Sequence, residues 1–93
     1  MTGLEVRAVS GADELRAALA LRTEVFVAEQ GVPVELEVDD QDPIAEHLVV
    51  VQDGRVLATA RLVHDGDVTK LGRLAVARHA RRRGLARLLL DES

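Results

Sequence analysis

The sequence predicts one α/β domain with a mixed sheet, in the element order β-α-loop-β-β-β-α. Three observations indicate this class. Runs with the two-residue period of strands alternate with runs of helical period. Two short Asp-Gly turns separate three consecutive strand-like runs. The length of 93 residues suits one domain, 1–93, and leaves no room for a second.

The first half of the chain predicts a strand, a helix and an acidic loop. Apolar and polar side chains alternate over residues 4–9, which is typical of a half-buried strand. Residues 10–13, Ser-Gly-Ala-Asp, predict a capping box that opens a helix. Apolar residues at helical spacing extend that helix to about Ala28. Residues 32–45 have no clean period and indicate an acidic loop with a short helix.

The second half predicts an antiparallel meander. Residues 47–52 form a short apolar run rich in β-branched side chains, which indicates a buried strand. Asp53-Gly54 predicts a type I′ hairpin turn. Alternation over residues 55–63 predicts the next strand, and the turn at residues 65–67 leads to a third strand over residues 68–76.

The last element is a helix over residues 81–92 with Leu85, Leu88 and Leu89 on its buried side. It ends in Asp-Glu-Ser without a glycine or asparagine cap, and its acids lie at the unfavourable end of the helix dipole. We therefore expect the C-terminal part of the domain to be missing from residues 1–93.

Composition excludes several classes of function. The absence of cysteine excludes disulfides, thiolate zinc sites and a cysteine nucleophile, and we expect no metal. No apolar run is long enough to span a membrane, and the N-terminus lacks the pattern of a signal peptide, so we expect a cytoplasmic protein. Phe26 is the single aromatic residue, which argues against base stacking and hence against nucleic-acid binding.

Charge is divided along the chain. Residues 29–46 contain seven acids and no lysine or arginine, whereas residues 78–87 contain five arginines and no acid. The division indicates an anionic partner for the basic end, with two solvated surfaces as the alternative. At the basic end, the sequence predicts a strand, a short loop, a group of arginines, a glycine and then a helix. Gly84 permits a close backbone approach at a helix start, so this unit suits a di- or polyphosphate.

The pattern Arg81-x-x-Gly84-x-Ala86, directly after a Leu-Ala-Val strand, resembles the Arg/Gln-x-x-Gly-x-Gly/Ala motif of GNAT acyl-CoA N-acyltransferases. Residues 22–33, and the acidic residues 35–42 leading to His47, resemble one branch of the same family. Together the three stretches cover most of the chain in the expected order, so the resemblance implies the N-terminal portion of the GNAT fold.

The resemblance also implies where coenzyme A binds. The backbone of Leu74, Ala75 and Val76 would hold the pantetheine arm, and a backbone N–H there would polarise the thioester carbonyl. The pyrophosphate would bind to the motif and its flanking residues, which are Arg81, Arg82, Arg83, Gly84, Leu85, Ala86 and Arg87.

The catalytic and acceptor-binding roles rest on fewer residues than the coenzyme A site does. The acceptor amine must lose a proton, and Glu29 and His47 are the expected bases, with Glu46 and His64 as further candidates. Many family members protonate the leaving thiolate with a tyrosine, which this sequence lacks. Three arginines either line the acceptor site or form surface salt bridges: Arg22, Arg61 and Arg73.

The resemblance therefore implies an N-acetyltransferase that moves an acetyl group from acetyl-CoA, as co-substrate, to a primary amine of a small molecule or peptide. The alternative is an incomplete or degenerate GNAT fragment that binds coenzyme A weakly or not at all. Neither nucleic acid nor membrane is an expected partner. The exposed edge of the strand at residues 68–76 predicts a homodimer.

Overall fold

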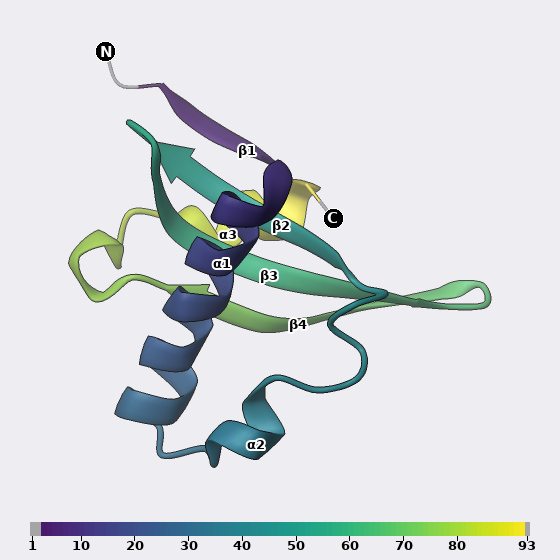
Figure 1. Ribbon diagram of the computed structural model, residues 1–93. Helices are drawn as coiled ribbons and strands as arrows, with labels where there is room; N and C mark the ends of the chain where they lie inside the picture. The colour runs from purple at the N-terminus through teal and green to yellow at the C-terminus, as the bar shows by residue number, and fades with distance from the viewer. Residues whose placement is uncertain (1–2, 93) are drawn as a thin grey trace.

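The computed structural model describes residues 3–92 and contains a four-stranded antiparallel sheet with α1 on one face and α3 on the other (Figure 1). A π-helix over Thr23–Glu29 prolongs α1, and a short 3-10 helix over Arg78–Ala80 precedes α3. The elements are β1 Leu4–Ala8, α1 Gly11–Arg22, α2 Val34–Glu37, β2 Glu46–Gln52, β3 Arg55–Asp65, β4 Val68–Val76 and α3 Leu85–Glu92.

The sheet has the order β1-β2-β3-β4, so each strand pairs with its neighbour in sequence and the predicted class, order and meander are confirmed. All pairings among the described strands are antiparallel, whereas the sequence led us to expect a mixed sheet. Asp53 and Gly54 have φ angles of 52° and 78°. Two consecutive left-handed residues are what a type I′ turn requires. The β2–β3 register then shifts by one residue between Val50 and Val51, where β3 has the extra residue Leu57.

The core lies on both faces of the sheet because side chains alternate along β2. Leu48 and Val50 belong to the larger apolar cluster, which also contains Leu89 of α3. Val49 packs instead in a smaller cluster with Ala18 of α1. Within residues 3–92 no helix is long and apolar enough to cross a membrane.

The predicted capping box is wrong in detail. The Ser10 side chain makes no capping hydrogen bond. Instead the Ser10 backbone N–H donates to Oε1 of Glu14 at 2.7 Å, and Arg7 donates to both oxygens of the same carboxylate. The acid that closes the helix start is therefore one residue later than the motif predicts, because Arg7 of β1 holds it there.

The last helix begins at Leu85, four residues later than predicted. The physical reason is the backbone before it, since Arg82 and Gly84 have φ angles of 66° and 75°. Left-handed residues cannot continue an α-helix. The buried positions Leu85 and Leu89 within the helix are as predicted.

A group of charged side chains packs against residues 32–45, the predicted acidic loop, which we call the acidic segment. Arg22 and Glu37 are each 1% exposed, and Arg22 Nε donates to Glu37 Oε1 at 2.9 Å. Nη1 of the same guanidinium donates to Asp42 Oδ1 at 2.7 Å. Arg61 of β3 reaches the same Asp42 oxygen at 3.1 Å. Adding the two neighbours that bind these groups defines the buried ionic cluster: Arg22, Glu37, Asp39, Asp42, Arg61 and Arg73.

We expect Arg22→Met to lower the free energy of unfolding by about 3–5 kcal/mol, because removing one partner leaves buried carboxylates without their counter-charge. Urea unfolding followed by circular dichroism measures this. Arg16→Met is the matched control, since Arg16 is an exposed arginine of α1 and its replacement should change stability by less than about 0.5 kcal/mol. Equal losses in the two variants would contradict the importance of the cluster.

Candidate functional site

A bulge interrupts the pairing of β3 with β4. Thr59 is opposite Ala75, and Arg61 is opposite Gly72, so β4 contains one residue more than β3 between these pairs. The extra residue lies at Arg73, whose φ of 51° is left-handed. A bulge leaves backbone groups unpaired and bends the strand. Because β4 has no neighbour on its outer side among the described strands, its backbone is open there to a ligand.

The acidic segment holds this bulge in place. Arg73 Nε donates to the carbonyl oxygen of Glu37 at 3.0 Å, and its Nη2 donates to that of Leu36 at 3.0 Å. Nη2 also binds Asp39 Oδ2 at 3.2 Å. Three oxygens from one segment therefore fix the side chain of the bulged residue, which offsets the cost of its left-handed backbone.

The turn from β4 into α3 forms the second part of the site, which we call the phosphate loop, residues 81–86. Its left-handed residues Arg82 and Gly84 alternate with other conformations, and such alternation directs successive backbone N–H groups into one concavity. The N-terminus of the eight-residue α3 follows directly. Unpaired N–H groups and the helix dipole together favour an anion there.

The arginines of this region have different surroundings. Arg81 Nε donates to the carbonyl oxygen of Val76 at 3.0 Å, and its Nη2 binds Glu29 Oε1 at 2.8 Å. Arg78 Nη2 lies 3.7 Å from the other Glu29 oxygen. Arg81 thus ties the loop to β4 and to the end of the π-helix. Arg82 is exposed and makes no ion pair with any residue in the described range 3–92.

The remaining two predicted phosphate-binding arginines have partners of their own. Arg83 Nη2 donates to Gln52 Oε1 at 3.2 Å, and Arg87 Nε lies 3.7 Å from Asp91 within α3. Leu85 is buried against the core, so only its backbone can contact a ligand.

The candidate bases do not gather at one place. Glu29 lies beside the phosphate loop, as described above. His47 is 6% exposed on β2, where its Nε2 lies 3.0 Å from the carbonyl oxygen of Asp42. Its Nδ1 has no hydrogen-bond partner among residues 3–92. His64 is exposed near the β3–β4 turn, between Glu46 Oε1 at 3.3 Å and Thr69 Oγ1 at 2.9 Å.

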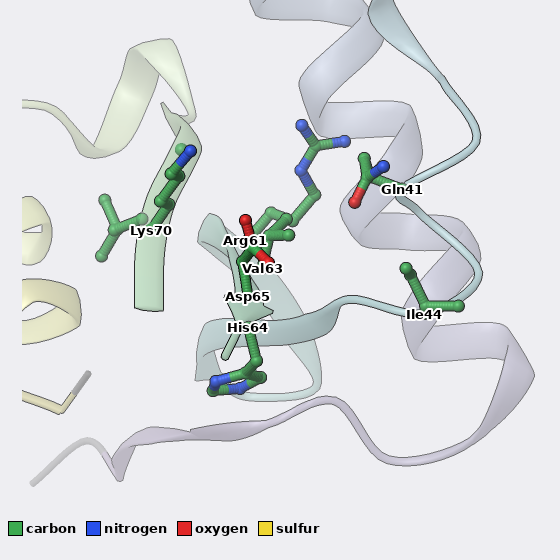
Figure 2. Close-up of a pocket in the computed structure, with 9 residues that line it drawn as sticks. Gln41, Ile44, Arg61, Val63, His64, Asp65 and Lys70 are labelled. Carbon is green, nitrogen blue, oxygen red and sulfur yellow. The ribbon is translucent and has the colours of Figure 1, made fainter. Parts of the chain in front are cut away.

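Two cavities border the acidic segment. The larger, about 520 Å³, is bounded by the α2–β2 connection, β3 and β4, and Figure 2 shows the Arg61 guanidinium directed toward Gln41 while His64 points the opposite way. Its wall includes Gly72, the residue before the bulge. The smaller, about 260 Å³, is lined by Arg73 with neighbours Phe26, Val32, Leu36 and Glu37.

The three arginines predicted for the acceptor site do converge, but on carboxylates. Arg22 is buried and fully engaged by Glu37 and Asp42, so it presents no group to a ligand in this structure. Arg61 and Arg73 line the larger and the smaller cavity while keeping their ion pairs. Sequence reasoning missed the partners. The available signal was seven acids in a segment without periodicity.

The described residues contain no group of three histidine, aspartate or glutamate side chains arranged to hold a metal ion.

The chain is similar to known proteins in both sequence and structure. The family model described as "Acetyltransferase (GNAT) family" matches residues 13–93. The uncharacterized N-acetyltransferase YjcF of Bacillus subtilis is 32% identical over 78 residues, which is 84% of this chain and 56% of that protein. The chain spans about three fifths of the length of the curated relatives it matches.

Two solved structures are also similar. An acyl-CoA N-acyltransferase from Pseudomonas aeruginosa superposes with a TM-score of 0.82 at 33% identity, covering 99% of this chain and 67% of that one. A structure titled "putative N-acetyltransferase from Lactobacillus plantarum" gives a TM-score of 0.87 at 30% identity, covering 97% of this chain and 64% of that one.

Stability should fall as the pH decreases from about 4 to about 2. Burial disfavours the Asp42 carboxylate, but hydrogen bonds from Arg22, the Asp39 backbone N–H and Arg61 outweigh it and lower the pKa of Asp42 to about 2. A carboxylate with a depressed pKa in the folded state stabilises the fold above its unfolded pKa of about 3.9, and this contribution is lost as it protonates. Urea unfolding at a series of pH values measures the slope.

Asp42→Asn should be less stable at pH 7 and should show a shallower loss between pH 4 and pH 2. Asp67→Asn, in the exposed β3–β4 turn, is the control and should keep the parent's slope. A parent-like slope in Asp42→Asn would contradict the assignment.

The left-handed bulge predicts an unusual order of stability at residue 73. In an ordinary strand glycine is less stable than alanine by roughly 0.5–1 kcal/mol. At residue 73 the order should reverse, because glycine adopts a positive φ without strain while alanine does not. Urea unfolding of Arg73→Gly and Arg73→Ala tests this. The same pair at Lys70, an exposed position of β4 without positive φ, should keep the ordinary order, and an ordinary order at both positions would disprove the bulge.

Proposed function

Because the chain belongs to the GNAT acetyltransferase family, we propose that it transfers an acetyl group from acetyl-CoA to a primary amine of a small molecule or peptide. The observation that carries the proposal is the arrangement of β4. β4 has its bulge at Arg73, three residues before the strand ends at Val76, and this same end leads into the phosphate loop and the N-terminus of α3. A ligand with a diphosphate and a long amide-containing arm matches both features.

The chain's own residues bind and orient acetyl-CoA, which supplies the activated acetyl thioester. Backbone N–H groups of the phosphate loop and α3 contact the pyrophosphate, and the exposed Arg82 neutralises its charge. The backbone of Leu74, Ala75 and Val76 pairs with the pantetheine arm in the manner of an added strand. A backbone N–H freed at the bulge donates to the thioester oxygen, whose negative charge grows as the amine attacks.

The acceptor amine enters through the larger cavity, since its wall includes Gly72 beside the bulge. Arg61 borders this route. Of the two expected bases we keep Glu29 for proton removal, because its carboxylate is 18% exposed. His47 is covered by the structure around it and fits a positioning role. A cytoplasmic location, and a homodimer through the edge of β4, stay predictions.

Calorimetric titration with acetyl-CoA tests the proposal. The parent should bind saturably. Arg82→Gly keeps the left-handed backbone while removing the guanidinium, so it should weaken binding about tenfold, as expected for one charge-assisted hydrogen bond. Gly84→Ala strains the backbone that presents the N–H groups and should weaken binding at least as much.

Arg16→Ala, an exposed arginine of α1, is the control for overall charge and should bind like the parent. If a folded parent does not bind acetyl-CoA, the proposal fails for these 93 residues. The reading as a GNAT fragment that is not itself catalytic would then be the better one.

A further inference from the structure

A third cavity, of about 410 Å³, lies between the β2–β3 turn and the phosphate loop. Its walls come from the end of β2 and start of β3, the 3-10 helix and the phosphate loop. The lining residues are Gln52, Asp53, Arg55, Leu57, His79 and Arg83. None of the roles proposed above uses this cavity.

Two contacts hold its walls together. The Ala77 backbone N–H donates to the carbonyl oxygen of Leu57 at 2.8 Å, which continues the β3–β4 pairing into the turn that leads to His79. Arg83 Nη2 donates to Gln52 Oε1 at 3.2 Å, which fixes the phosphate loop to the end of β2. The cavity is therefore built by two segments about 25 residues apart in the chain and joined at both sides.

The cavity has an excess of donors that carry positive charge or can gain it. Arg55, His79 and Arg83 line it against a single carboxylate, Asp53. Within residues 3–92 neither Arg55 nor His79 forms an ion pair, and Arg83 binds a neutral amide. The arginines of the buried ionic cluster, by contrast, are matched one to one by acids. Unmatched guanidinium and imidazole groups around one cavity favour a dianionic phosphate monoester over a carboxylate or a neutral group.

We infer that this cavity binds the 3′-phosphate of coenzyme A, an inference that rests on the proposed function. Coenzyme A has a phosphate monoester on its ribose, next to the pyrophosphate. Arg83 is on the cavity wall and directly precedes Gly84 of the phosphate loop, so a ligand on the loop has its ribose within reach of the cavity. The chain then distinguishes coenzyme A from its 3′-dephospho form by the side chains of Arg55, His79 and Arg83.

The experiment compares acetyl-CoA with 3′-dephospho-acetyl-CoA by calorimetric titration of the full chain. The parent should bind acetyl-CoA at least tenfold more tightly. Arg55→Gln should reduce the ratio of the two affinities below about threefold, mainly by lowering the affinity for acetyl-CoA. Its affinity for the dephospho form should stay within twofold of the parent's. Arg16→Gln is the charge-matched control and should keep the parent's ratio. Circular dichroism checks that both variants fold.

The outcomes distinguish a failure of this inference alone from a failure of the proposed function. Equal affinity of the parent for the two ligands would overturn the inference and leave the function intact. A tenfold preference that survives Arg55→Gln and His79→Gln would place the 3′-phosphate elsewhere and also overturn it. No binding of either ligand would overturn both. Inorganic phosphate at millimolar concentration should lower the affinity for acetyl-CoA more in the parent than in Arg55→Gln. An equal effect in both proteins would argue against this cavity as the phosphate site.

Discussion

The buried ionic cluster is the interaction on which the rest of the structure depends. It joins α1, the acidic segment, β3 and β4 through three arginines and three carboxylates, so its formal charge is balanced. Charges removed from water stabilise a fold only when each finds its partners. The acidic segment has too few apolar contacts to hold itself, and Leu36 and Ile44 are exposed. The guanidinium groups of Arg22, Arg61 and Arg73 therefore fix the path of this segment. They also fix the walls of the two cavities that it borders.

Through Arg73, the same cluster reaches the part of β4 where the proposed ligand binds. This residue is at once a member of the cluster and the bulged residue of β4. Further along the same strand and loop, Arg82 and Gly84 also have left-handed backbones. Two of these departures from regular geometry lie in the loop that follows β4 and one lies within the strand, close to where the proposed ligand binds. A separate register shift interrupts the β2–β3 pairing at Val50 and Val51. Strain of this kind persists where surrounding contacts hold it, as the carbonyl groups of Leu36 and Glu37 do at Arg73.

Local patterns predicted the meander, both turns, the buried face of the last helix and the family, because each depends on neighbours in the chain. The failures all involve contacts between distant residues or unusual backbone. Glu14 closes the start of α1 because Arg7 binds it, and α3 starts late because two residues before it are left-handed. The pairing of Arg22 with Glu37 spans 15 residues and that of Arg73 with Leu36 spans 37, and no periodicity reports such distances.

The cluster also restricts how this sequence can diverge. A change at Arg22, Glu37 or Asp42 leaves an unmatched charge inside the protein, so a tolerated replacement there needs a second change at a partner. Lysine is not an adequate substitute for Arg22, since one guanidinium donates to two carboxylates and a carbonyl at once. The effects of two substitutions there on the free energy of unfolding will not be additive. A change that is harmful alone can be neutral when a partner residue is changed as well. Evolution at these positions therefore proceeds by paired steps, which should appear as covariation among relatives.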